Sequence, residues 1–220
     1  GNVSQATDDF VLNVAADLPP TTSTLQITDD SGSTLVLLAN GASTHDTSPI
    51  LSGLAQAGDV IGIYDGDVLL GTVIAASNGQ WTFATADLTE GAHTFYVSIT
   101  DITGNSPNSS SITTTVDTTV PAAATDVQLS NDAGSSPVPI ASGGLTNDSS
   151  PLLSGSGEPG ATVNVYDGTT LLGTATVGSN SNWSFSTPAL GEGNHSLTTT
   201  VTDAVGNTSP ASDAITFTVD

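Results

Sequence analysis

The chain contains two copies of one unit, and this repetition constrains its fold more than any other feature. Aligned with itself at an offset of 102, which rises to 103 near the end, the sequence matches over long stretches. Residues 1–14 resemble 206–219, the end of a unit. We therefore divide the chain into the last strand of a preceding repeat (1–16), repeat 1 (17–117) and repeat 2 (118–220). The matched segments include 48–53 with 150–155, 64–66 with 166–168, 81–83 with 183–185, and 90–91 with 192–193.

Each unit reads as all-β. It is rich in Gly, Pro, Ser, Thr and Asn, and short segments alternate β-branched or aromatic residues with polar ones. About seven strands in roughly 100 residues predict an immunoglobulin-like Greek-key sandwich, and two such units in series predict an extended rod. In repeat 2 we expect strands near 126–129, 151–155, 162–167, 171–177, 183–186, 195–202 and 215–219.

The alternation also predicts which side chains face inward. Both tryptophans, Trp81 and Trp183, are expected in the cores. The other inward residues are predicted to be Ile61, Ile63, Phe83, Phe95, Val97, Ile99, Ile112, Thr114 and Val116 in repeat 1, and Val163, Val165, Phe185, Leu197, Thr199, Val201, Ile215, Phe217 and Val219 in repeat 2.

Charge sets the possible partners. The chain has 22 acidic residues, no Lys or Arg, and a formal net charge of -22. Nucleic acid and anionic lipid would be repelled, and no apolar run reaches the roughly 20 residues that span a bilayer. Any ion pair must use a protonated histidine or a metal ion, and a hard cation with oxygen ligands fits best. We therefore expect a hard cation as a partner, without nucleic-acid binding or membrane insertion.

The best candidate site for such a cation lies at the joint between the repeats. In an Ig-like sandwich the B to C and F to G loops return to the pole where the domain begins, beside the linker. For repeat 2 this would gather Asp117, Glu158, Asp203 and Asn207. Without a cation these acids would repel one another, because salt screens charges little at separations shorter than the Debye length of about 8 Å.

The joint before repeat 1 has a different set. Asp17, Asp101 and Asn105 are its candidate ligands, but Gln56 replaces Glu158, and Asp59 is the acid that could substitute. We expect a weaker or differently built site there.

A second group of acids is expected at the opposite pole. It comprises Asp30, Asp46 and Asp65 in repeat 1, and Asp132, Asp148 and Asp167 in repeat 2. Metal binding is one interpretation. Turn capping is the other, because short carboxylates in Asp-Gly and Asp-Ser sequences commonly accept hydrogen bonds from backbone amides.

The histidines and the rest of the sequence give no sign of catalysis. His93 and His195 begin an inward-facing strand, so we expect buried rings bonded to backbone groups, and neither unit supplies the ligands of a zinc site. No nucleophile elbow or phosphate-binding loop is present, and we predict that the protein is not an enzyme.

The combination of motifs resembles the bacterial Ig-like repeats of giant surface adhesins and biofilm-associated proteins. The motifs are residues 147–155, 158–163, Tyr-Asp-Gly at 166–168, 202–207, and the Asp-Thr-Thr-Val-Pro joint at 117–121. The resemblance implies an extracellular or cell-surface stalk, often exported by type I secretion, with calcium at or near its joints. On this basis we expect a monomeric, non-catalytic spacer for cell adhesion or biofilm formation, whose partners are neighbouring repeats and calcium. The alternative is a module that binds a glycan or host surface through an exposed sheet face.

Overall fold

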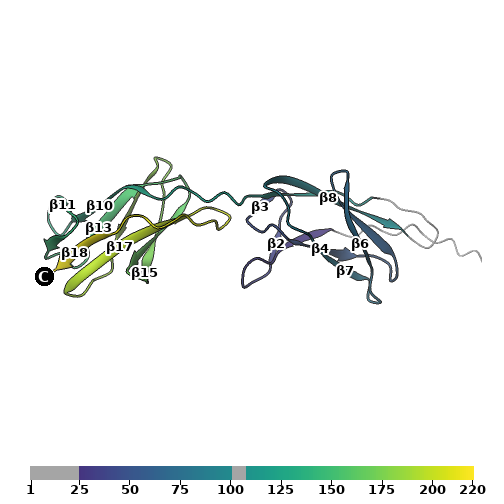
Figure 1. Ribbon diagram of the computed structural model, residues 1–220, viewed down its shortest axis with the longest axis horizontal. Helices are drawn as coiled ribbons and strands as arrows, with labels where there is room; N and C mark the ends of the chain where they lie inside the picture. The colour runs from purple at the N-terminus through teal and green to yellow at the C-terminus, as the bar shows by residue number, and fades with distance from the viewer. Residues whose placement is uncertain (1–24, 101–107) are drawn as a thin grey trace, which may run out of the picture.

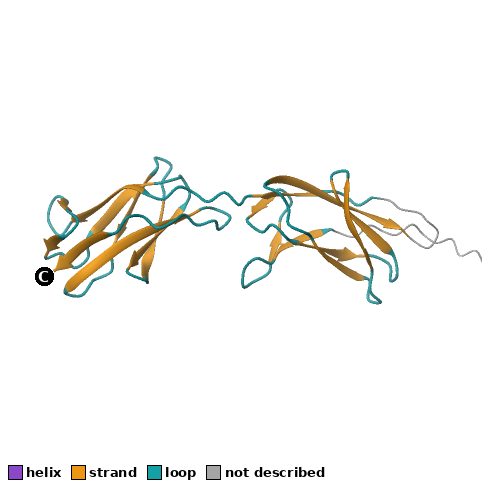
Figure 2. Ribbon diagram, viewed as in Figure 1, coloured by secondary structure: helices purple, strands orange, loops and turns teal. Residues whose placement is uncertain are grey.

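The computed structural model describes residues 25–100 and 108–220. Within these ranges the chain forms two bodies of β strands that follow one another along the long axis and are joined by a single connection (Figure 1). Strands and loops make up everything described, and no helix occurs there (Figure 2). The strand predicted within residues 1–16 lies outside the described residues.

Repeat 1 is a sandwich of two sheets. The four-stranded sheet has the order β2-β1-β4-β7, and the five-stranded sheet has the order β3-β9-β8-β5-β6. All its pairings are antiparallel except that of β3 with β9. The strands are β1 (Gln26–Asp29), β2 (Val36–Leu38), β3 (Ala42–Thr44), β4 (Ile50–Leu54), β5 (Val60–Asp65), β6 (Val68–Ile74), β7 (Gln80–Ala84), β8 (Gly91–Thr100) and β9 (Ile112–Val116).

Repeat 2 has the same topology. Its sheets have the orders β11-β10-β13-β16 and β12-β18-β17-β14-β15, with β12 parallel to β18. The strands are β10 (Thr125–Asn131), β11 (Val138–Ile140), β12 (Gly144–Thr146), β13 (Leu152–Ser156), β14 (Thr162–Asp167), β15 (Thr170–Thr176), β16 (Asn182–Ser186), β17 (Gly193–Thr202) and β18 (Ile215–Val219).

The predicted all-β sandwich fold is confirmed, with two additional short strands in each repeat. In repeat 2 the chain leaves β10, makes a hairpin with β11, and then crosses to the other sheet as β12. Each added strand has only three residues, and in repeat 2 the two lie in a stretch rich in Pro and Gly. Pairing with β18 stabilises β12, and this long-range contact is not encoded in local alternation.

The predicted inward faces are confirmed. Trp81 and Trp183 are each 4% exposed at the centre of their sandwiches. Gly155 lies against the Trp183 indole so closely that a Cβ there would lie 2.8 Å from Cζ2, and Gly53 has the same relation to Trp81. The fully buried residues include Ile61, Ile63, Phe95, Val97, Val163, Val165, Leu197 and Val201, with Phe83, Ile112, Phe185 and Ile215 partly buried around them.

In the part of the chain that the structure describes, no helix is long and apolar enough to cross a membrane.

Candidate metal centre at the joint between the repeats

The connection between the repeats is held by the end of repeat 1. The backbone N–H of Asp117 donates to the Thr44 carbonyl at 2.8 Å, which prolongs the pairing of β9 with β3 by one residue. Beyond it, the Glu90 carboxylate accepts hydrogen bonds from the backbone and hydroxyl of Thr118 and from the hydroxyl of Thr119. The bonds from Thr118 are the main reason that the pKa of Glu90 is lowered. The first residues of the linker are therefore fixed to repeat 1.

The facing loop of repeat 2 is organised by Asp203. Its Oδ1 atom accepts three backbone N–H bonds, from Val205, Gly206 and Asn207, at 2.8 to 2.9 Å. Its Oδ2 atom accepts a bond from the Asn207 amide, which also donates to the Asp117 carbonyl at 2.8 Å. Burial raises the pKa of Asp203, but these hydrogen bonds together lower it, so the carboxylate is held ionised.

Four carboxylates line one cavity at this joint. Glu90 and Asp117 come from repeat 1 and its linker, and Glu158 and Asp203 come from loops of repeat 2. The cavity has a volume of about 600 Å³. The donor set therefore consists of oxygen atoms from acids, which suits a hard cation such as calcium.

The carboxylates line the cavity without converging. Within residues 25–100 and 108–220, no three acidic or histidine side chains are grouped closely enough to hold a metal ion as they stand. Asp117, Glu158 and Asp203 share the cavity, and Asn207 is tied to Asp203 by hydrogen bonds. An ion would have to draw these side chains inward.

Candidate ligands at the other joint lie mostly outside the described residues, namely Asp17, Asp101 and Asn105. Asp59, the acid considered as a substitute there, is described and is 5% exposed. Its Oδ2 atom accepts the backbone N–H of Gln56 at 3.1 Å, across the turn that precedes β5.

The acids at the pole opposite the start of each repeat, which in repeat 1 is the end that meets repeat 2, are used in turns. Asp46 is buried and accepts the backbone N–H groups of Asp30 and Ser48. Asp148 makes the corresponding bonds to Asp132 and Ser150 in repeat 2. Both carboxylate oxygens of Asp46 and of Asp148 thus have backbone donors, as the turn interpretation predicts. The metal interpretation of this group remains an untested prediction.

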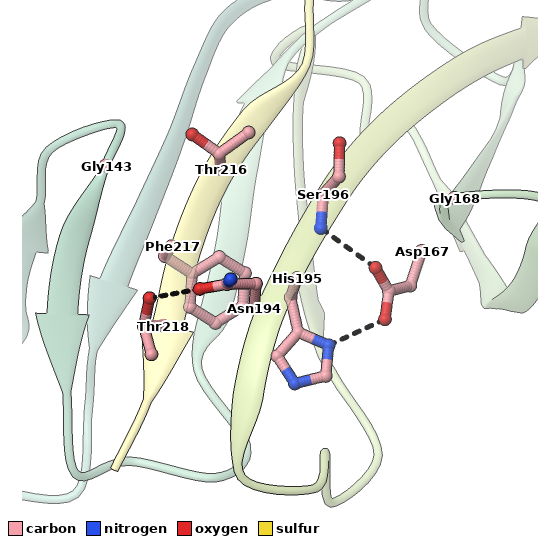
Figure 3. Close-up of a pocket in the computed structure, with 9 residues that line it drawn as sticks. All are labelled: Gly143, Asp167, Gly168, Asn194, His195, Ser196, Thr216, Phe217 and Thr218. Atoms are coloured by element: carbon pink, nitrogen blue, oxygen red, sulfur yellow. Dashed lines mark hydrogen bonds and ion pairs between the residues drawn. The ribbon is translucent and has the colours of Figure 1, made fainter.

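Asp65 and Asp167 instead pair with histidines. In repeat 2, Asp167 accepts the Nδ1 atom of His195 at 2.7 Å and the backbone N–H of Ser196 at 2.9 Å, beside a cavity of about 660 Å³ (Figure 3). Asp65 and His93 repeat this arrangement at 2.6 Å. The ion pairs found among the described residues are thus of the protonated-histidine kind expected from the sequence.

Both histidine rings face acceptors on both nitrogens. The Nε2 atom of His195 meets the Gly191 carbonyl at 2.8 Å, and that of His93 meets the Thr89 carbonyl at 2.8 Å. Only the imidazolium form donates from both nitrogens at once. The Asp167 hydrogen bond is the main cause of the raised pKa of His195; burial lowers the pKa of His93, but the bonds to Thr89 and Asp65 outweigh it and the pKa is raised. The predicted backbone bonds are confirmed, and the aspartate partner is an addition.

Two residues of the joint were missed in the sequence. Glu90 precedes a glycine, which by itself indicates an ordinary turn, and its partners in the linker follow it by 28 and 29 residues. His45 lies in a loop sequence with no motif around it, yet its Nδ1 atom contacts the Val205 carbonyl of the next repeat. A backbone carbonyl has no sequence signature, so only the alignment of the repeats could have singled out His45.

The fold and the joint define a protein of tandem Ig-like sandwiches with an acidic interface between them. The bacterial Ig-like domain family matches the chain twice, over residues 17–118 and 119–220, and the chain belongs to this family. Such families are typically structural and non-catalytic.

Solved structures with similar folds include the BSP domain of a biofilm associated protein (23% identity, TM-score 0.33, covering 82% of this chain and 29% of that one). Another is that of the fibronectin(III)-like modules of Clostridium thermocellum CbhA (17% identity, TM-score 0.48, covering 88% of this chain and 94% of that one). A third is the D0-D1 domain of Intimin (12% identity, TM-score 0.28, covering 82% of this chain and 95% of that one). The chain thus spans less than a third of the first of these structures. A search of curated proteins finds no match.

Proposed function

We propose that this segment is a non-catalytic spacer of an extracellular bacterial adhesin, and that calcium at the joint stiffens the connection between its repeats. The observation that carries the proposal is the cavity lined by Glu90, Asp117, Glu158 and Asp203, which combines acids from both sides of the joint. Membership of the bacterial Ig-like family supports a structural, surface-exposed role. In this role the protein is monomeric and binds its neighbouring repeats.

The chain's own residues prepare the joint for a cation. Glu90 accepts hydrogen bonds from the linker, and Asp203 accepts hydrogen bonds from the facing loop. The carboxylates on both sides of the joint are therefore attached to ordered segments of backbone. No Lys or Arg occurs in the chain to neutralise them. A bound calcium ion would supply that positive charge and link the two repeats through shared ligands, of which Asp117, Glu158 and Asp203 are the proposed side chains.

Small-angle X-ray scattering in calcium and in chelator tests the proposal. We expect an extended, narrowly distributed envelope in calcium and a broader range of inter-repeat angles after chelation. Asp117→Asn should abolish the difference. Asp220→Asn is the matched control, since Asp220 occupies the same position at the end of repeat 2, where its N–H donates to the Thr146 carbonyl as that of Asp117 donates to Thr44. Identical scattering of the unmodified chain in both conditions would refute calcium stiffening.

The glycan-binding alternative depends on exposed aromatic rings. Tyr64 and Tyr96 stack on each other with centroids 4.9 Å apart and planes 1° from parallel, so each uses one face on the other. This contact leaves the spacer role as the better supported function. Specific, saturable binding of a glycan by the segment would favour the alternative.

A further inference from the structure

His45 makes a direct contact between the repeats that involves no carboxylate of the proposed calcium site. It follows β3 of repeat 1 and directs Nδ1 at the Val205 carbonyl of repeat 2 at 2.5 Å. The ring also lies against Gly206, where a Cβ would be 3.3 Å from both Cε1 and Nδ1. Gly206 has φ of +107°, a conformation that favours glycine. The loop of repeat 2 therefore offers both a carbonyl acceptor and room for the ring.

Repeat 1 holds the imidazole from behind. The Nε2 atom of His45 lies 3.1 Å from the Ser31 hydroxyl, which donates to Asp29 Oδ1 at 2.6 Å and therefore accepts from the ring. The ring thus donates from both nitrogens, to Ser31 and to the Val205 carbonyl, as only the imidazolium form does. Asp29 is itself fixed, because its Oδ1 atom accepts the Ser31 N–H and its Oδ2 atom accepts the Thr44 hydroxyl. A chain of hydrogen bonds thus runs from Asp29 through Ser31 and His45 to repeat 2.

The receiving loop is fixed independently. Asp203 accepts the N–H groups on either side of the Val205 carbonyl, those of Val205 and Gly206. The carbonyl that meets His45 is therefore presented by an ordered turn, and neither partner has to be immobilised when they meet.

Repeat 2 replaces all three residues of this chain at once. At the offset of 102, Asp29, Ser31 and His45 correspond to Asn131, Ala133 and Asn147. The Asn131 amide donates to Asn147 Oδ1 and Thr146 Oγ1 within its own repeat. The surrounding turn is unchanged, since Asp46 and Asp148 accept the same backbone bonds at 3.0 Å. The scaffold is kept and only the contact residues differ.

We propose that Asp29, Ser31 and His45 form a metal-independent latch for the F to G loop of the following repeat, and that repeat 2 lacks this latch. The partner is defined by a backbone carbonyl at the position of Val205 followed by a glycine at the position of Gly206. Successive joints of the stalk then differ in stiffness, because ends that carry the imidazole add a contact that needs no ion to the bond between the Asn207 amide and the Asp117 carbonyl.

Distance measurements between the repeats test the latch. The chain has no cysteine, so Val68→Cys and Thr170→Cys introduce a unique pair of spin labels at exposed, equivalent positions. Pulsed electron spin resonance would compare the unmodified joint with His45→Asn, the residue found in repeat 2. Asn147→Ala is the matched control, since it changes the same position where no described residue of another repeat makes contact.

In chelator we expect the distance distribution of the unmodified joint and of Asn147→Ala to keep a narrow component beside the broader one that loss of calcium adds, and that of His45→Asn to lose the narrow component. Ser31→Ala, the residue of repeat 2, should broaden the distribution in the same way, and it provides a second variant if His45→Asn fails to fold. A distribution for His45→Asn that matches the unmodified joint in chelator would overturn the latch. The calcium proposal fails separately, if added calcium leaves the distribution of every variant unchanged.

Discussion

Replacing Gly155 by alanine tests the packing at the centre of repeat 2. The added Cβ would lie 2.8 Å from Cζ2 of Trp183 and 2.9 Å from the Thr125 carbonyl oxygen. One neighbour is a buried indole and the other is backbone, so neither can move aside without disturbing a sheet. Gly155 pairs with Trp183 in the register of β13 and β16, so the methyl group would strain this contact directly.

These contacts allow the loss of stability to be estimated. An extra methyl group forced into a packed core costs about 1–3 kcal/mol. For a domain of roughly 100 residues, each kcal/mol lowers the melting temperature by about 4–8 °C. We therefore expect the transition of repeat 2 to fall by about 4–24 °C in Gly155→Ala, while that of repeat 1 stays within about 2 °C.

Differential scanning calorimetry of the whole chain is the assay. Gly191→Ala is the control, since a Cβ at Gly191 would meet no atom within 4 Å. It should leave both transitions in place. A Gly155→Ala chain that melts with the same profile as Gly191→Ala would refute the close packing of Gly155 on Trp183.

Three further results are expected. The pKa values of His93 and His195 are raised, so their pairs with aspartate stabilise the fold fully below about pH 6.5 and lose this contribution as the pH rises through the folded pKa values. The melting temperature should therefore fall as the pH rises through this range, and the double variant His93→Gln/His195→Gln should make that fall smaller. Calcium at about ten times its dissociation constant should add about 1.4 kcal/mol per site, seen as a higher melting temperature that Asp117→Asn removes. Glu90→Gln weakens the bonds to the linker, so amide hydrogen exchange at Thr118 should accelerate, whereas an unchanged rate would show that Glu90 does not fix it.

Much of the fold could be predicted because the repeat and the alternation are local features of the sequence. Strands β14 and β18 begin and end where the pattern predicts, and Trp81 and Trp183 are buried as expected. The short strands β11 and β12 could not be predicted, because their existence depends on pairing with β10 and β18 and not on their own three residues.

The candidate site was only partly predictable. Sandwich topology was enough to predict that Asp117 and Asp203 would lie at one pole, and both line the joint cavity. It could not predict that Glu90 would bind the linker, since Glu-Gly is also an ordinary turn sequence. The contact of His45 depends on how two folded repeats meet. Its only trace in the sequence is that Asp29, Ser31 and His45 are all replaced at the equivalent positions of repeat 2.

The most direct test of calcium at the joint is anomalous X-ray diffraction from crystals of the whole chain grown in calcium. We predict an anomalous peak in the cavity between the repeats, with oxygen atoms of Asp117, Glu158 and Asp203 among the ligands at about 2.3–2.6 Å. An ordered joint with no anomalous peak at saturating calcium would contradict the proposal that calcium stiffens this connection.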